Sequence, residues 1–143
     1  MHSLSRMNTI TRCKNLWYTS KLEGTGIGAG DRLYLLYVCH HPNVSQDTLS
    51  AALYVNKSSV TRRLAHLEKE GFVTRTSSEA DRRVMLVAPT EKALALLPRL
   101  AELKREWNAI ITEGFTEEEL EAFSHLIDRA LQNARQQAKE FTE

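Results

Sequence analysis

The chain has 143 residues, of which 42% are hydrophobic and 26% are charged, and its formal net charge is +1. This size and composition are typical of one globular domain and exclude a disordered or fibrous protein. No apolar run approaches the ~20 residues that cross a bilayer, and the first residues lack the apolar core of a signal peptide. Two cysteines are too few for a disulfide framework. We therefore expect a cytoplasmic protein without a membrane partner.

The charge is unevenly distributed. Residues 57–83 carry seven basic and four acidic side chains, a balance of 7 − 4 = +3, whereas residues 91–143 carry seven basic and eleven acidic ones. A basic middle region suits contact with phosphate groups, although an uneven solvated surface gives the same count.

The first half of the chain predicts three helices. Residues 4–22 place Met7, Ile10, Cys13 and Trp17 at helical spacing, which makes an apolar stripe. The glycines of residues 24–30 end this helix and predict a flexible connection, since the run lacks the spacing of a nucleotide-binding loop. A mostly buried helix over residues 31–40 with Asp31 as its cap follows, and then a short helix over residues 46–53 capped by Ser45, with Leu49, Ala52 and Leu53 facing inward.

The middle of the chain predicts a fourth helix and a hairpin. The helix covers residues 57–70, with Asn56 as its N-cap and Gly71 just after its end. Two β-rich runs, residues 72–75 and 84–87, are separated by a polar turn over residues 76–83 and predict a β-hairpin with a long loop.

Two long helices complete the chain. One covers residues 91–113, with Thr90 at its start and Pro98 inside it, where a kink is expected. The other runs to about residue 139 and begins with a capping box formed by Thr116 and Glu119. Its apolar face is made by Leu120, Phe123, Ile127, Ala130, Leu131 and Ala134.

The predicted fold is therefore mainly α, in the order α-α-α-α-β-β-α-α, with a small β-hairpin as a wing. Three helices and the hairpin make a compact winged helix-turn-helix unit. The outer helices have wide apolar stripes, and a chain this short has little else to cover them. Self-association into a homodimer is the simplest way to bury these stripes.

Residues 45–71 have the plan of a DNA-binding helix-turn-helix, whose second helix enters the major groove. At 100° per residue, Val60, Leu64 and Leu67 cluster on the inner face of that helix, and the opposite face is small, polar and basic. Short serines allow close approach to base edges, and the forked guanidinium of Arg62 suits guanine. An ordinary amphipathic helix with a solvated exterior remains the alternative for this helix taken alone.

The predicted hairpin loop adds Asp81, Arg82 and Arg83. An arginine at a hairpin tip can enter the narrow minor groove, and Asp81 can accept hydrogen bonds that hold the loop in shape. A solvated turn is the alternative. With the preceding helices, the loop completes a predicted DNA-binding set: Ser45, Lys57, Ser58, Ser59, Thr61, Arg62, Arg82 and Arg83, with Asp81 as support.

The series SQDTLSAAL, LEKEGFVTR, DRR and PTEK, at the spacing it has over residues 44–90, resembles the multiple antibiotic resistance regulator (MarR) family. The resemblance extends over nearly the whole chain. It implies one domain over residues 1–143, in which residues 31–90 form the DNA-binding lobe and residues 1–30 and 91–143 a helical dimerisation region. It also implies a homodimer on a pseudo-palindromic operator, more often a repressor, with Ser58, Ser59 and Arg62 in the base-reading places.

The resemblance further implies an effector, commonly an aromatic acid or phenol. Aromatic rings beside a cation suit an aromatic anion, although ordinary core packing explains the same residues. The candidate pocket residues are Trp17, Tyr18, Arg32, Tyr34 and Tyr37. No metal or cofactor is expected, since the five histidines form no metal-ligand spacing, and Cys13 and Cys39 are expected to be packing residues with raised pKa values.

Two other classes of function compete with a regulator. A winged-helix interaction module without DNA binding would present an acidic or apolar outward face, whereas here that face carries Arg62 and Lys69. An enzyme would need a nucleophile with its base, paired carboxylates or a cofactor loop, and none can be assembled from this sequence. The sequence therefore predicts a DNA-binding regulator.

Overall fold

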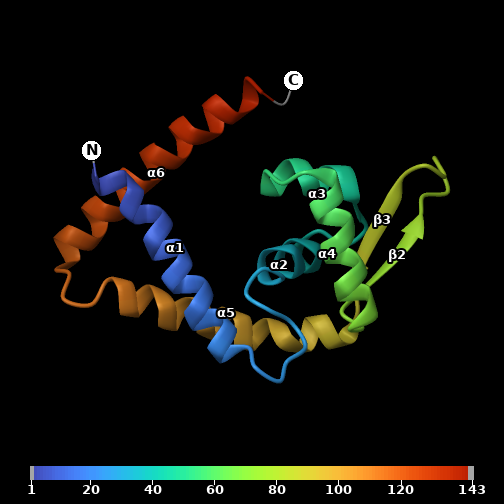
Figure 1. Ribbon diagram of the computed structural model, residues 1–143, viewed down its shortest axis with the longest axis horizontal. Helices are drawn as coiled ribbons and strands as arrows, with labels where there is room; N and C mark the ends of the chain where they lie inside the picture. Colours follow the sequence, from blue (N-terminus) through green and yellow to red (C-terminus); the bar gives the residue numbers. More distant parts are fainter. Residues whose placement is uncertain (1, 142–143) are drawn as a thin grey trace. The chain divides into compact units, whose positions relative to one another are not determined.

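The computed structural model describes residues 2–141. Over this range it has six helices and a small antiparallel sheet, which confirms the predicted fold class (Figure 1). It divides into two units, one up to Lys104 and one from Arg105. The elements are α1 (His2–Lys21), α2 (Arg32–His40), β1 (Val44–Ser45), α3 (Gln46–Leu53), α4 (Lys57–Lys69), β2 (Val73–Ser77), β3 (Met85–Pro89), α5 (Glu91–Ile111) and α6 (Glu117–Lys139).

The predicted hairpin forms, but both strands begin later than predicted and extend further. Val73 pairs with Pro89 and Ser77 with Met85. Phe72 is excluded from β2 because its N–H closes the end of α4 on the carbonyl of Leu67, at 2.8 Å. The backbone alone makes this hydrogen bond, so the β-propensity of the Phe72 side chain does not predict it.

The sheet has a third strand that the sequence analysis did not predict. β1 contains only two residues and pairs with β3 through Val44 and Val87, so that the order in the sheet is β1-β3-β2. Two residues cannot show a period of two, and their strand conformation depends on a partner more than forty residues away. No local signal in the sequence could have indicated β1.

The core of the first unit fixes α4 on its inner side. Val60, Leu64 and Leu67 of α4 have no exposed surface, as predicted. α4 packs against α3 and β2, and α2 packs against α3 and β3 (Figure 1). Burial of three aliphatic side chains at about 1.5–3 kcal/mol each leaves α4 little freedom to rotate about its axis. Its polar side is therefore presented outward.

Three of the predicted caps are confirmed, and one is wrong. Ser45 accepts from the N–H of Thr48, Asn56 from that of Ser59, and Thr116 forms the full capping box. Asp31 does not cap α2, because its backbone is already helical and its carboxylate makes other bonds. The inward orientation predicted for Ala52 is also wrong: Ala52 is exposed, whereas Leu49 is buried.

The second unit contains the end of α5 and all of α6. α5 continues as one helix through Pro98 in the first unit and ends at Ile111. Gly114, with φ +83°, turns the chain, and Phe115 meets the ring of Phe123 edge-on at 5.6 Å. No residue of α6 is buried among those described, and its predicted apolar face is exposed in the single chain. None of the described helices is long and apolar enough to span a membrane.

Candidate nucleic-acid interface

The first turn of α4 is held by one side chain. Asn56 Oδ1 accepts hydrogen bonds from the N–H of Ser59 and from the hydroxyl of Ser58, both at 2.8 Å. Helix N-termini have unpaired N–H groups, and this cap satisfies one of them. Ser58 is therefore fixed at the exposed N-terminal end of the helix.

Arg62 lies one turn after Ser58 and Ser59 and is exposed. Its Nη2 makes a long hydrogen bond of 3.4 Å to Ser59 Oγ. Guanidinium groups have five N–H donors, so most of those on Arg62 face solvent. Small hydroxyl side chains and one long cation thus share the outward face of α4, as the sequence predicted.

The other residues at α3 and α4 that are predicted to contact DNA already form hydrogen bonds or an ion pair within the chain. Lys57 and Asp47 form an exposed ion pair at 3.3 Å. The hydroxyl of Thr61 donates to the carbonyl of Lys57, and the hydroxyl of Ser45 donates to that of Thr48 while it caps α3. These groups lie at the edge of the outward face, where their N–H and O–H groups could donate to phosphates.

A polar network that the sequence analysis missed joins α3, α4 and β2. Arg75 Nη2 donates to Glu68 Oε1 at 3.1 Å, and Arg75 Nη1 lies 3.4 Å from Gln46 Oε1. Gln46 in turn reaches the hydroxyl of Thr61 at 3.4 Å. Hydrogen bonding from Arg75 lowers the pKa of Glu68. This network bridges the side of α4 to the wing and restrains their relative position.

The loop of the hairpin is organised by Asp81. Arg83 binds its carboxylate through Nε and Nη2, each at 3.1 Å, and through its backbone N–H at 3.0 Å. These bonds hold the pKa of Asp81 below its usual value, so the carboxylate stays charged at neutral pH. Arg82 is exposed, and the side chain of Arg83 is 91% exposed. Asp81 thus holds Arg83 as predicted, with both arginines directed to solvent.

A second unpredicted cluster lies beside α4 at the start of α2. The side chain of Asp31 is only 3% exposed, and it accepts from Arg63 at 3.2 Å and lies 3.5 Å from His66 Nε2. It also accepts from the N–H of Gly28 at 2.8 Å. Asp31 is 32 positions before Arg63, so only the fold brings these groups together.

Comparison with known proteins identifies the family. A model of the MarR family matches residues 25–84. The uncharacterized HTH-type transcriptional regulator YybA of Bacillus subtilis (strain 168) is 29% identical over 130 residues, which is 91% of this chain and 87% of YybA. The predicted resemblance to the MarR family is thereby confirmed, as is the prediction of a regulator rather than an enzyme.

Solved structures agree with this MarR fold. The MarR protein of Peptoclostridium difficile DA00132 superposes with a TM-score of 0.94 at 23% identity, covering 99% of this chain and 93% of that one. A putative MarR family regulator of Listeria monocytogenes, solved in complex with a 26mer DNA, has a TM-score of 0.84 at 22% identity, covering 94% and 89%. These structures share the winged-helix fold.

The predicted effector residues do not line one pocket. Trp17 and Tyr18 meet edge-on at 5.1 Å, and the guanidinium of Arg32 lies 4.2 Å from the ring centroid of Tyr18, so these three are packed together. Tyr34 is buried in the core. Tyr37, by contrast, lines a cavity between α2, α3 and α5.

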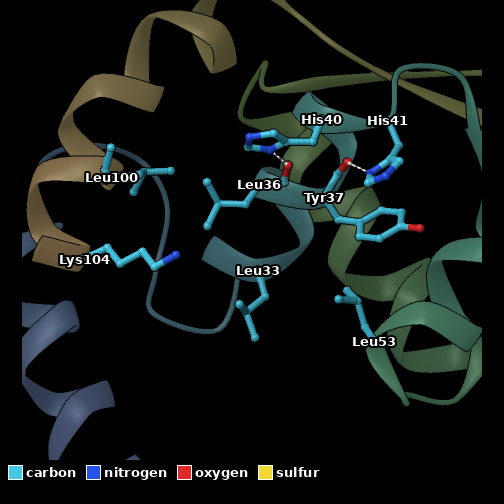
Figure 2. A pocket seen from close by; sticks show the side chains of 9 residues that line it. Leu33, Leu36, Tyr37, His40, His41, Leu53, Leu100 and Lys104 are labelled. Atoms are coloured by element: carbon cyan, nitrogen blue, oxygen red, sulfur yellow. Dashed lines mark hydrogen bonds between the residues drawn. The ribbon is translucent and has the colours of Figure 1, made fainter. Parts of the chain in front are cut away.

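The cavity beside Tyr37 has a volume of about 450 Å³ and is lined mainly by leucines, with Lys104 and two histidines (Figure 2). His41 stacks on the ring of Tyr37 at 4.2 Å and contacts the Tyr37 carbonyl through Nδ1. His40 Nδ1 contacts the carbonyl of Leu36 at 2.7 Å. An apolar cavity with one ammonium at its margin has the chemistry to hold a small organic anion.

The cysteines differ from one another. Burial raises the pKa of Cys39, as expected for a packing residue. Cys13 was expected to be buried, and this is wrong for the single chain, where it is exposed. The apolar stripe of α1 is covered only near its C-terminal end, where Tyr18 and Leu22 are buried. Over residues 2–141, no group of three metal-ligating side chains comes together.

Proposed function

We propose that this MarR-family chain binds double-stranded DNA through α4 and the hairpin wing and acts as a transcription regulator. The observation that carries the proposal is the outward face of α4, where Ser58 and Arg62 are exposed opposite three fully buried aliphatic residues and Ser59 lies on the flank. A helix held by its inner face and small at its outer N-terminal end can enter a major groove. That a MarR-family relative of the same fold was solved with DNA supports the proposal.

The contacts divide by chemistry. Arg62, with Ser58 and Ser59, is proposed to read base edges, because its guanidinium can bind guanine O6 and N7 together. Ser45, Lys57 and Thr61 are proposed to contact phosphates, which position the protein without reading sequence. Arg82 and Arg83 extend from the wing toward the minor groove, with Asp81 as support. The basic, polar character of this surface favours DNA over a protein partner.

We further propose a homodimer on a pseudo-palindromic operator. α6 exposes Leu120, Phe123, Ile127 and Leu131, and α1 exposes Leu4, Met7, Ile10 and Leu16. Patches of this kind on soluble proteins mark association surfaces. Residues 1–30 and 91–143 would form the dimerisation region and residues 31–90 the DNA-binding lobe of one domain. A two-fold dimer would place two α4 helices on half-sites one helical turn apart.

The proposed regulator is cytoplasmic, represses its target and is released by a small organic anion, such as an aromatic acid. The cavity beside Tyr37 supports an anion of this kind, because it combines leucine side chains with Lys104 (Figure 2). Its lining comes from α2, α3 and α5, so that an occupant would contact elements that carry the helix-turn-helix. Of the aromatic residues that the sequence predicts to form a pocket, Tyr37 is the one that lines this cavity.

A titration of the intergenic DNA upstream of the gene, followed by fluorescence anisotropy at several salt concentrations, tests DNA binding. The wild-type chain should bind with an affinity that falls steeply with salt. Arg62→Ala should lose about 1–3 kcal/mol of discrimination at one base pair. Arg83→Ala should weaken binding to many sequences alike. If both variants bind as the wild type does, the assigned surface is wrong.

A further inference from the structure

A hollow of about 350 Å³ lies on one side of α4 and is lined by Ser59, Arg62, Arg63 and His66. These residues follow one another by three, one and three positions, so they form one stripe along the helix. A hydroxyl, two guanidinium groups and an imidazole are all capable of donating hydrogen bonds, and no carboxylate is among the lining residues. A hollow surrounded by donors suits an oxyanion.

Two of the four lining residues are anchored by a buried carboxylate. Asp31 lies 3.2 Å from Arg63 Nη1 and 3.5 Å from His66 Nε2, and its own side chain is 97% buried. The N–H of Gly28 holds Asp31 Oδ2 at 2.8 Å. Because the N–H of Gly28 holds the Asp31 carboxylate, Asp31 in turn positions Arg63 and His66, whose side chains are 43% and 47% exposed.

The guanidinium of Arg63 is also held against the backbone of Gly30. A Cβ atom at Gly30 would lie 2.9 Å from both Arg63 Nη1 and Nη2, closer than such contacts allow. The ring centroid of Tyr34 is 5.8 Å from the same guanidinium. Glycine at position 30 therefore permits the observed place of Arg63, and a side chain there would move Arg63 away from the hollow.

We propose that this hollow receives one phosphate of the DNA backbone, bound by Arg63 and His66 and set in place by Asp31. The proposal rests on the proposed DNA-binding function and assigns a contact to two residues outside the base-reading set. A DNA phosphate fits better than a free oxyanion because Ser59 and Arg62 border both the hollow and the base-reading face. Asp31, Arg62 and Arg63 together carry a net charge of 2 − 1 = +1.

The test is an anisotropy titration of a specific and an unrelated duplex at several salt concentrations. Arg63→Ala should bind both duplexes about tenfold more weakly, with a salt slope lower by about 1. His66→Ala should also bind both duplexes more weakly, because it removes the second group of the proposed phosphate site.

Gly30→Ala keeps Asp31 and Arg63 but displaces the guanidinium, so it should reproduce part of the Arg63→Ala effect in a folded protein. Gly28→Ala is its matched control, because a Cβ there meets only Asp31 Oδ2, at an ordinary 3.7 Å. Thermal unfolding verifies that each variant is folded.

The outcomes separate the two proposals. If the wild type binds and Arg62→Ala alters base discrimination, but Arg63→Ala, His66→Ala and Gly30→Ala keep the wild-type affinity and salt slope, the phosphate site is overturned and DNA binding stands. Loss that is confined to one DNA sequence also overturns it, because a phosphate contact acts on all sequences. If the wild type binds neither duplex, the proposed function itself fails.

Discussion

At the tip of the wing, the carboxylate of Asp81 holds the side chain of Arg83, and this contact should affect DNA affinity. Asp81→Asn removes the charge that receives Nε and Nη2 of Arg83. Free arginine side chains lose rotamer entropy when they bind, so DNA affinity should fall roughly fivefold. An anisotropy titration measures this loss, with the exposed Glu79→Gln of the same loop as control. Unchanged affinity would show that the pair does not prepare the wing for DNA.

Glu68 joins α4 to β2 through Arg75, and its contribution to stability depends on pH. Because hydrogen bonding from Arg75 lowers its pKa in the folded chain, the pair stabilises the fold above the unfolded pKa of about 4.3, and this contribution disappears as pH falls through the lower folded value. Since the Glu68 side chain is 41% exposed, Glu68→Gln should cost less than about 1 kcal/mol at pH 7.

Urea unfolding of the wild type and Glu68→Gln at pH 7 and pH 3, at one protein concentration, checks this prediction. The difference in free energy of unfolding should be larger at pH 7 than at pH 3. A difference that grows toward pH 3 would mean that Arg75 does not stabilise the charged carboxylate.

Among the elements, α4 depends on its cap. Asn56→Ala removes the acceptor for the N–H of Ser59 and for the hydroxyl of Ser58, and should cost about 1 kcal/mol of stability. Asn56→Ser retains a capping oxygen and should stay close to the wild type. Thermal unfolding compares the two variants. Equal losses in both would contradict capping as the role of Asn56.

The elements also show how far the sequence determines the structure. The bounds and caps of α3, α4 and α6 could be predicted, because caps such as Ser45 and Asn56 act on residues only three positions away. β1 could not, because its strand conformation depends on β3. Aspartate is a common N-cap residue, and the sequence therefore predicts Asp31 as a cap. Its partners in the structure, Arg63 and His66, come close to Asp31 only when α4 packs beside the start of α2.

The candidate site follows the same division. Ser58 and Arg62 could be assigned to the outward face, and Ser59 to its flank, from helical periodicity alone. Arg63 and His66 could not be assigned to a phosphate site by periodicity, since the hollow requires Gly30 and Asp31 from another segment. Helical periodicity could not predict the cavity around Tyr37 either, because α2, α3 and α5 each contribute part of its lining.

For the whole molecule, the proposed dimer predicts the effect of a charge on α6. Ile127 is 39% exposed in the single chain, within the apolar face of that helix. Ile127→Glu should place a charge in the dimer interface and give particles of 16.3 kDa rather than twice that mass. Arg129→Glu, on the opposite side of α6, should remain dimeric. Light scattering after gel filtration measures both, and a dimeric Ile127→Glu would exclude α6 as the interface.

The most direct test of DNA reading by the α4 surface is selection of bound sequences from a pool of random duplexes. The wild-type chain should enrich a pseudo-palindrome whose half-sites lie about 10 base pairs apart. Arg62→Ala should enrich the same pattern with one position in each half-site no longer specified. Recovery of no common sequence by the wild type, or of an identical pattern by both proteins, would contradict the proposal that α4 reads DNA through Arg62.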